Sequence, residues 1–266
     1  MKRPLGTVAA IAALALAAGC GGNSGNDAGS GSGSSPSAAS GGVTGTVTVF
    51  AAASLTESFT TLGKQFEAAH PGTTVKFNFG ASSSLAENIN QGAPADVFAS
   101  ASAKNMKQVV DAGGAGDSKT FANNVMQIAV PPDNPANVAQ VTDLANPKIK
   151  VALCQPEVPC GTVAQEVFKK ADVTVKPVTQ GADVKAVLTT VQLGEVDAGM
   201  VYKTDVQAAG TKVKGIEIPA DQNASTSYPI AALSKAPNAA GASAFVDYVL
   251  SPDGEKVLEQ AGFAAP

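Results

Sequence analysis

The segment from residue 47 to residue 99, VTVFAAASLTESFTTLGKQFEAAHPGTTVKFNFGASSSLAENINQGAPADVFA, indicates the fold class. It holds short strand-like runs at 47–50, 75–79 and 96–99, rich in Val and Phe. Between them, apolar residues recur at helical spacing over 55–66 and 85–89. The resulting β-α-β-α-β order is typical of a parallel sheet covered by helices.

The same alternation restarts in the second half of the chain. Apolar runs at 125–130, 150–153 and 198–202 predict strands, and the patterns at 162–171 and 184–191 predict helices. This restart predicts an α/β protein of two similar lobes.

A strand at 228–233 and helices from 239 and 251 follow, and this tail needs a surface to pack on. Its return to the first lobe would give two crossing segments, near 125–131 and 226–232, as in a hinge. The predicted organisation is lobe 1 at 44–127 and 229–266, and lobe 2 at 128–228.

The N-terminal residues read as a targeting segment. Lys2 and Arg3 precede an apolar run at 8–18, which is too short for a membrane span of about 20 residues and fits a signal peptide. The run ends in Ala18-Gly-Cys20, so we predict a signal peptide at 1–19 and a lipid on Cys20. Plain secretion with cleavage nearby is the alternative.

Residues 20–43 then combine the lipidated Cys with a tether of mostly Gly, Ser, Asn and Ala. Such a segment cannot bury enough apolar surface to fold, so we expect it to be flexible. The predicted location is therefore extracytoplasmic, with the protein anchored to the outer face of the cell membrane through Cys20 alone.

The composition excludes several classes of ligand. The net charge of −4 gives no basic surface for nucleic acid, and the absence of Trp disfavours a sugar site. No Arg follows Arg3, so a bound anion would be held by neutral donors or by Lys. No His, Cys, Asp or Glu cluster has the spacing of a structural metal site.

Enzyme chemistry finds little support in the chain. The only His is His70, which lies beside Pro71 in a helix-ending turn and does not suit a Ser-His-Asp triad. The glycine-containing loop at 80–84 lacks the Lys of a phosphate-binding P-loop. A Ser-Lys pair remains formally open, so a serine-lysine hydrolase is kept as an alternative.

Two cysteines remain if Cys20 carries lipid. Cys154 and Cys160 are six positions apart in an exported chain, which favours a disulfide over two buried thiols. The loop that this disulfide would close is too short for a large entropic stabilisation, so we expect the disulfide to stiffen the loop.

Small-residue loops precede the predicted helices at 51–57, 80–85, 159–162 and 181–184. In an open α/β fold such loops lie at the carboxyl edge of the sheet, where helix N-termini offer N–H groups to anions. The alternative is that they only start helices, with Ser54–Glu57 and Ser84–Glu87 as capping boxes.

Four segments, VTVFAAASLT at 47–56, FGASSSLA at 79–86, GAPADVF at 92–98 and GMVY at 199–202, resemble the periplasmic molybdate-binding proteins of ABC importers. The similarity runs from about Val47 to Phe263. It implies the two-lobed type II periplasmic-binding-protein fold, with a mixed, mostly parallel sheet flanked by helices in each lobe and two hinge crossovers. It also implies an oxyanion held by neutral donors in the interlobe cleft.

Carried over by motif, the resemblance implies hydroxyl donors at Ser54, Ser82 and Tyr202 and main-chain N–H donors at Cys160 and Val184. Cys160 departs from a common Ala, which a main-chain donor tolerates. The alternatives are helix caps for the serines, ordinary helix starts for Cys160 and Val184, and a core tyrosine.

The resemblance also implies the ligand, molybdate or tungstate, and the partner, an ABC importer permease. Molybdate would be bound through its oxygens, without a free metal cation or a cofactor, by a monomer that is not an enzyme. Hydrogen phosphate carries a proton, which a site of donors alone disfavours. It would become a candidate ligand if the Asp183 carboxylate pointed inward to accept that proton. Sulfate and thiosulfate are also candidate ligands, and a transporter-independent adhesion or scaffold lipoprotein is a candidate function of a different class.

Overall fold

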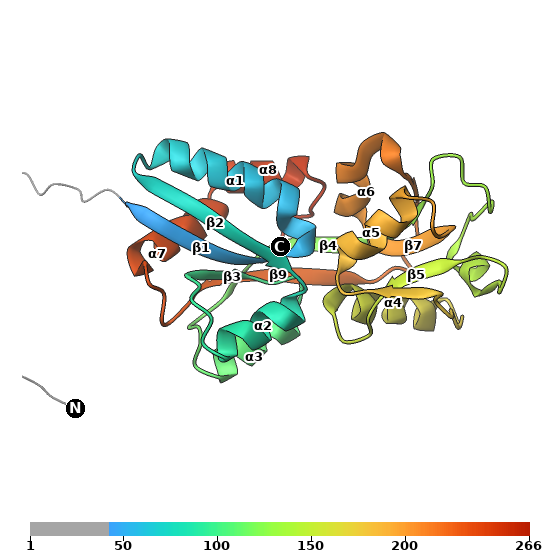
Figure 1. The fold of residues 1–266 in the computed structure, drawn as a ribbon, viewed down its shortest axis with the longest axis horizontal. Helices are drawn as coiled ribbons and strands as arrows, with labels where there is room; N and C mark the ends of the chain where they lie inside the picture. Colours follow the sequence, from blue (N-terminus) through green and yellow to red (C-terminus); the bar gives the residue numbers. More distant parts are fainter. Residues whose placement is uncertain (1–42) are drawn as a thin grey trace, which may run out of the picture. The chain divides into compact units, whose positions relative to one another are not determined.

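The computed structural model describes residues 43–266 (Figure 1). The predicted signal peptide, the lipidation of Cys20 and the tether up to residue 42 lie outside the described residues. Within the described part of the chain, no helix is long and apolar enough to cross a membrane.

Lobe 1 is built on three parallel strands in the order β2-β1-β3, with β9 added antiparallel beside β3. Side chains alternate across the sheet, so Val47, Val49 and Ala51 of β1 join one core and Phe50 joins another. Helices α1, α7 and α8 cover the first face, and α2 and α3 cover the second (Figure 1). The elements are β1 (Gly45–Ala52), the 3-10 helix η1 (Ala53–Leu55), α1 (Thr56–Ala69), β2 (Thr73–Gly80), α2 (Ser82–Asn90), β3 (Val97–Ala99), α3 (Ala103–Asp111), β9 (Ser225–Ala232), α7 (Ala239–Val249) and α8 (Pro252–Gln260).

Lobe 2 repeats this plan around the parallel strands β6, β5 and β7, with β4 antiparallel to β7 and β8 antiparallel to β4. Its core gathers apolar side chains from the central strands and from α4 and α5. The elements are β4 (Lys119–Val130), η2 (Val141–Ala145), β5 (Val151–Cys154), α4 (Pro159–Lys170), β6 (Thr179–Gly181), α5 (Val184–Gln192), β7 (Ala198–Tyr202), α6 (Lys203–Ala209), η3 (Gly210–Lys212) and β8 (Lys214–Ile216).

Strands β4 and β9 join the two lobes. The first half of β4 pairs with β9, from Lys119 to Val125, and its second half pairs with β7, from Met126 to Ala129. One continuous sheet results, in the order β2-β1-β3-β9-β4-β7-β5-β6. The predicted α/β class, with a mixed sheet flanked by helices, is confirmed, although β3, β4, β7, β8 and β9 also form antiparallel pairs.

The sequence pattern missed the helices α3 and α6 and the two three-residue strands β6 and β8. Only Met106 and Val109 supply large buried apolar side chains in α3, which is too few for a clear helical stripe. Helix α6 begins at Lys203, directly after the last residue of β7, so no turn-forming residues separate the two elements.

Candidate binding site

A small cavity lies between the two lobes, next to the carboxyl ends of β1 and β2 and the start of α4 and α5. All five residues predicted from the sequence line it: Ser54, Ser82, Cys160, Val184 and Tyr202. Its volume is about 20 Å³, on a scale where one water needs about 10–15 Å³. The space in this conformation therefore favours a very small solute over a sugar or a peptide.

Ser54 lies in η1 at the end of β1, and its side chain is buried. Its hydroxyl is 2.8 Å from the hydroxyl of Tyr228 on β9. The predicted Ser54–Glu57 capping box is wrong: α1 begins at Thr56 after Leu55, without a side-chain cap. The extra 3-10 turn moves Ser54 off the capping position and leaves Glu57 for a different contact.

Ser82 is the first residue of α2, and its Oγ accepts a hydrogen bond of 2.9 Å from the N–H of Ala101. Since a hydroxyl has one proton, that proton remains available to a guest in the cavity. The predicted Ser84–Glu87 capping box is wrong because the helix starts two residues earlier, after Ala81.

Helix α4 presents Cys160 at its second position, where a main-chain N–H has no acceptor inside the helix. Cys160 is joined to Cys154, the last residue of β5, by a disulfide with Cα atoms 5.8 Å apart. A Cβ on Gly161 would lie 2.0 Å from the carbonyl oxygen of Gln155. Glycine therefore lets the first turn of α4 pack directly on the loop after β5.

Helix α5 begins at Val184, after Asp183 as its N-cap. One carboxylate oxygen of Asp183 accepts a hydrogen bond of 2.9 Å from the N–H of Ala186. Asp183 lines the cavity, and this capping bond uses one of its two carboxylate oxygens. The N–H of Val184 precedes the capped position and has no acceptor inside the helix.

Tyr202 ends β7 and is 1% exposed. Its hydroxyl has no hydrogen-bond partner among residues 43–266, although buried polar groups are nearly always paired. Burial raises the pKa of Tyr202 well above its ordinary value, and the neighbouring Tyr228 and Asp205 raise it further. The phenol therefore keeps its proton and can donate it to an acceptor in the cavity.

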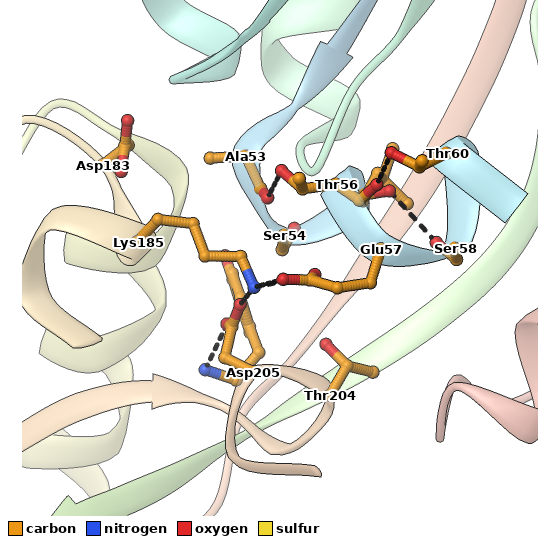
Figure 2. A network of polar contacts seen from close by, with 12 residues as sticks. Ala53, Ser54, Thr56, Glu57, Ser58, Thr60, Asp183, Lys185, Thr204 and Asp205 are labelled. Carbon is orange, nitrogen blue, oxygen red and sulfur yellow. Dashed lines mark hydrogen bonds and ion pairs between the residues drawn. The ribbon is translucent and has the colours of Figure 1, made fainter. Parts of the chain in front are cut away.

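An ion-pair network links the lobes beside the cavity (Figure 2). Lys185 of α5 lies 2.8 Å from the Glu57 carboxylate of α1 and 3.0 Å from the Asp205 carboxylate of α6. The other Asp205 oxygen accepts from the N–H of Tyr202 at 3.1 Å. Lys185, which directly follows Val184, is thus linked through Asp205 to Tyr202 and through Glu57 to the opposite lobe.

Burial raises the pKa of Asp205 to about 6, even though the positive charge of Lys185 opposes the shift. Burial also lowers the pKa of Lys185, but the carboxylates of Asp205 and Glu57 outweigh it and the net shift is upward. At neutral pH the pair is therefore charged. Sequence reasoning missed this network because residues 57, 185 and 205 share no motif and meet only in the folded chain.

No group of three or more His, Cys, Asp and Glu side chains in the described region could hold a metal ion. The cavity instead offers hydroxyls and main-chain N–H groups, which is a donor set for an anion.

Residues 47–264 match the model of a family described as bacterial extracellular solute-binding proteins. The chain belongs to this family. Among curated relatives of this solute-binding protein, the molybdate-binding protein ModA of Mycobacterium tuberculosis (strain H37Rv) is 40% identical over 222 residues, which cover 83% of this chain and 85% of the relative.

Solved structures of other binding proteins share the fold of this chain. The periplasmic molybdate-binding protein of Azotobacter vinelandii has a TM-score of 0.74 at 21% identity, covering 83% of this chain and 99% of the other. The sulfate-binding protein SubI of Mycobacterium tuberculosis has a TM-score of 0.73 at 20% identity, covering 83% and 86%. At these identities the likeness shows the fold alone, which is that of periplasmic binding proteins.

Proposed function

We propose that this solute-binding protein captures molybdate, and also tungstate, in the interlobe cavity for import across the membrane. The observation that carries the proposal is the buried Tyr202 hydroxyl, which has no partner in residues 43–266 and lines the cavity together with Ser54 and Ser82. The 40% identity to a molybdate-binding relative supports the same ligand.

The donor set matches an anion without a proton. Molybdate is a dianion with four acceptor oxygens, and the site offers three hydroxyls and the N–H groups of Cys160 and Val184. Hydrogen bonds to a charged group contribute about 1.5–3 kcal/mol each, and partly buried helix N-termini add up to about 2 kcal/mol. Neutral donors therefore suffice without a lysine in contact with the ion.

Hydrogen phosphate is disfavoured in this proposal. Its proton needs an acceptor, and Asp183 carries the one carboxylate among the described residues that line the cavity, with one of its two oxygens already bound to the N–H of Ala186 at the helix start. A donor left facing a P–O–H group would be buried without a partner, at a cost of about 1–3 kcal/mol.

Sulfate is the second candidate, because it has the same charge and shape and also carries no proton. The sulfate-binding protein SubI shares the fold. Discrimination between sulfate and molybdate would depend on the radius of the cavity, because sulfate is the smaller ion.

In this proposal the protein is a monomer without catalytic activity, held at the outer face of the membrane by a lipid on Cys20. Lobe 1 (44–127 and 229–266) and lobe 2 (128–228) would move about β4 and β9. A ligand that contacts both lobes stabilises the closed form by its higher affinity for that form. The closed form would then dock on the permease of an ABC importer.

Titration calorimetry of the mature protein with molybdate, tungstate, sulfate and hydrogen phosphate tests the proposal. Molybdate and tungstate should bind tightly, sulfate at least about tenfold more weakly and hydrogen phosphate at least about a hundredfold more weakly. The melting temperature should rise with molybdate concentration, because a ligand of the folded state stabilises it. Tighter binding of sulfate than of molybdate would assign the site to sulfate.

A further inference from the structure

The hydroxyl of Ser54 is not alone at the edge of the cavity. Behind it lies Tyr228 of β9, which is 0% exposed and whose hydroxyl is 2.8 Å from Ser54 Oγ. The ring of Tyr228 also packs against the ring of Tyr202, with centroids 6.2 Å apart. Tyr228 thus contacts two of the predicted ligand groups, although it does not line the cavity itself.

The direction of the hydrogen bond between the two hydroxyls follows from their neighbours. In the described residues, Tyr228 Oη has two partners, Ser54 Oγ and the side-chain nitrogen of Asn124, at 2.8 and 3.5 Å. An amide nitrogen can only donate, so Ser54 Oγ is the one acceptor among residues 43–266 within reach of the Tyr228 proton. Burial raises the pKa of Tyr228, so the phenol keeps that proton.

The amide of Asn124 is itself fixed. Its oxygen accepts from the N–H of Val125 at 3.0 Å, and its nitrogen donates to Thr204 Oγ1 at 2.9 Å. A flipped amide would place its nitrogen against the Val125 N–H, so the donating group must face Thr204 and Tyr228. The chain of donors therefore runs from Asn124 to Tyr228 to Ser54.

We infer that Tyr228 is a specificity-determining positioning residue, which holds Ser54 as a hydrogen-bond donor toward the cavity. With its oxygen occupied by the Tyr228 proton, Ser54 directs its own proton to the guest and is poorly placed to accept one. The main-chain N–H of Ala101 likewise occupies the oxygen of Ser82 and directs the Ser82 proton to the guest. The inference rests on the proposed function and names the device by which the site rejects anions that carry a proton.

The test compares the dissociation constants of molybdate and hydrogen phosphate in the wild type and in Tyr228→Phe, at a pH where phosphate is the hydrogen phosphate dianion. The variant keeps the ring but frees the Ser54 oxygen to accept a proton. Molybdate should bind about tenfold more weakly, and the preference for molybdate over hydrogen phosphate should fall by about tenfold or more. Tyr248→Phe is the matched control, since its hydroxyl contacts only Gln65 among the described residues.

Asn124→Asp is a second variant that deletes no side-chain volume. The new carboxylate can accept the Tyr228 proton and turn it away from Ser54, so the preference should fall as in Tyr228→Phe. Both anions carry two negative charges, so the added charge of Asp weakens the binding of both alike. The ratio of their two dissociation constants is therefore free of this effect. Thermal unfolding without ligand establishes which variants are folded, and either one alone suffices for the comparison.

If the wild type binds molybdate and a folded variant keeps the wild-type preference for molybdate over hydrogen phosphate, the role of Tyr228 is refuted and the proposed function stands. A uniform weakening for both anions would mean that Tyr228 only packs, and would refute it equally. Failure of the wild type to bind molybdate would instead refute the proposed function.

Discussion

The two walls of the cavity are held in place by different physics. On the lobe 1 side, the hydroxyls of Ser54 and Ser82 are oriented by uncharged donors, Tyr228 and the N–H of Ala101. On the lobe 2 side, α5 and Tyr202 are held by the ion pair of Lys185 and Asp205. Neutral bonds fix the direction of a proton, whereas the charged pair fixes the position of a whole helix and is sensitive to pH.

The disulfide adds to this difference. It fixes the first turn of α4 on the lobe 2 side, close to Cys160. Lobe 2 therefore presents its N–H donors from covalently and electrostatically restrained helix starts, while lobe 1 relies on buried side-chain hydrogen bonds. Three substitutions test this contrast between the walls.

Lys185→Met should have the largest effect, because it leaves the carboxylate of Asp205, which is 0% exposed, buried without its counterion. We expect the free energy of unfolding to fall by about 3 kcal/mol near neutral pH, measured by urea denaturation. The control is Lys107→Met, which removes an exposed ion pair with Asp111 and should cost about 0–1 kcal/mol.

The loss in Lys185→Met should depend on pH with a defined sign. The folded pKa of Asp205, about 6, lies above its ordinary 3.8. The group therefore favours the folded state most below its unfolded pKa, and this contribution is lost as the pH rises through 6. Without Lys185 the folded pKa rises further, so the deficit should be small near about pH 4 and grow toward about pH 8. A deficit independent of pH would contradict a role for the ion pair.

Tyr202→Phe should have the next largest effect, and on binding rather than on folding. It removes one donor to a charged ligand, so the molybdate affinity should fall by about ten- to a hundredfold in calorimetry. The stability without ligand should stay the same or rise slightly, because the deleted hydroxyl is buried and unpaired within residues 43–266. Wild-type affinity would remove Tyr202 from the site.

Glu57→Gln should have the smallest effect. Its carboxylate is the lobe 1 end of the network, its side chain is 52% exposed, and Lys185 keeps Asp205 as a partner. We expect the free energy of unfolding to change by less than about 1 kcal/mol and the molybdate affinity by less than about fivefold. Both changes should shrink at high salt.

Glu87→Gln is the control for this variant, because it removes an exposed carboxylate that has no ion pair in the described part of the chain. A loss in Glu57→Gln as large as that in Lys185→Met would show that the contact across the lobes dominates the network.

The sequence predicted most of the strands, because their signal is local. The runs that became β1, β2, β5 and β7 alternate with helical stripes, which marks them as strands even where, as between β7 and α6, no turn residue separates strand and helix. The same reasoning failed for the helix starts at Ser54 and Ser84, where a 3-10 turn and an earlier helix start replaced the expected caps. Capping depends on one or two backbone angles, which neighbouring loops can override.

Local sequence was enough to establish the order of strands and helices, the absence of arginine after residue 3, and the small-residue loops that became the cavity wall. Which hydroxyls donate and which charges meet emerged from the folded chain alone. Tyr228 reaches Ser54 across 174 positions, and Lys185 reaches Glu57 across 128. Local patterns report how each segment folds, but hydrogen-bond direction and ion pairing depend on which distant segments the sheet order brings side by side.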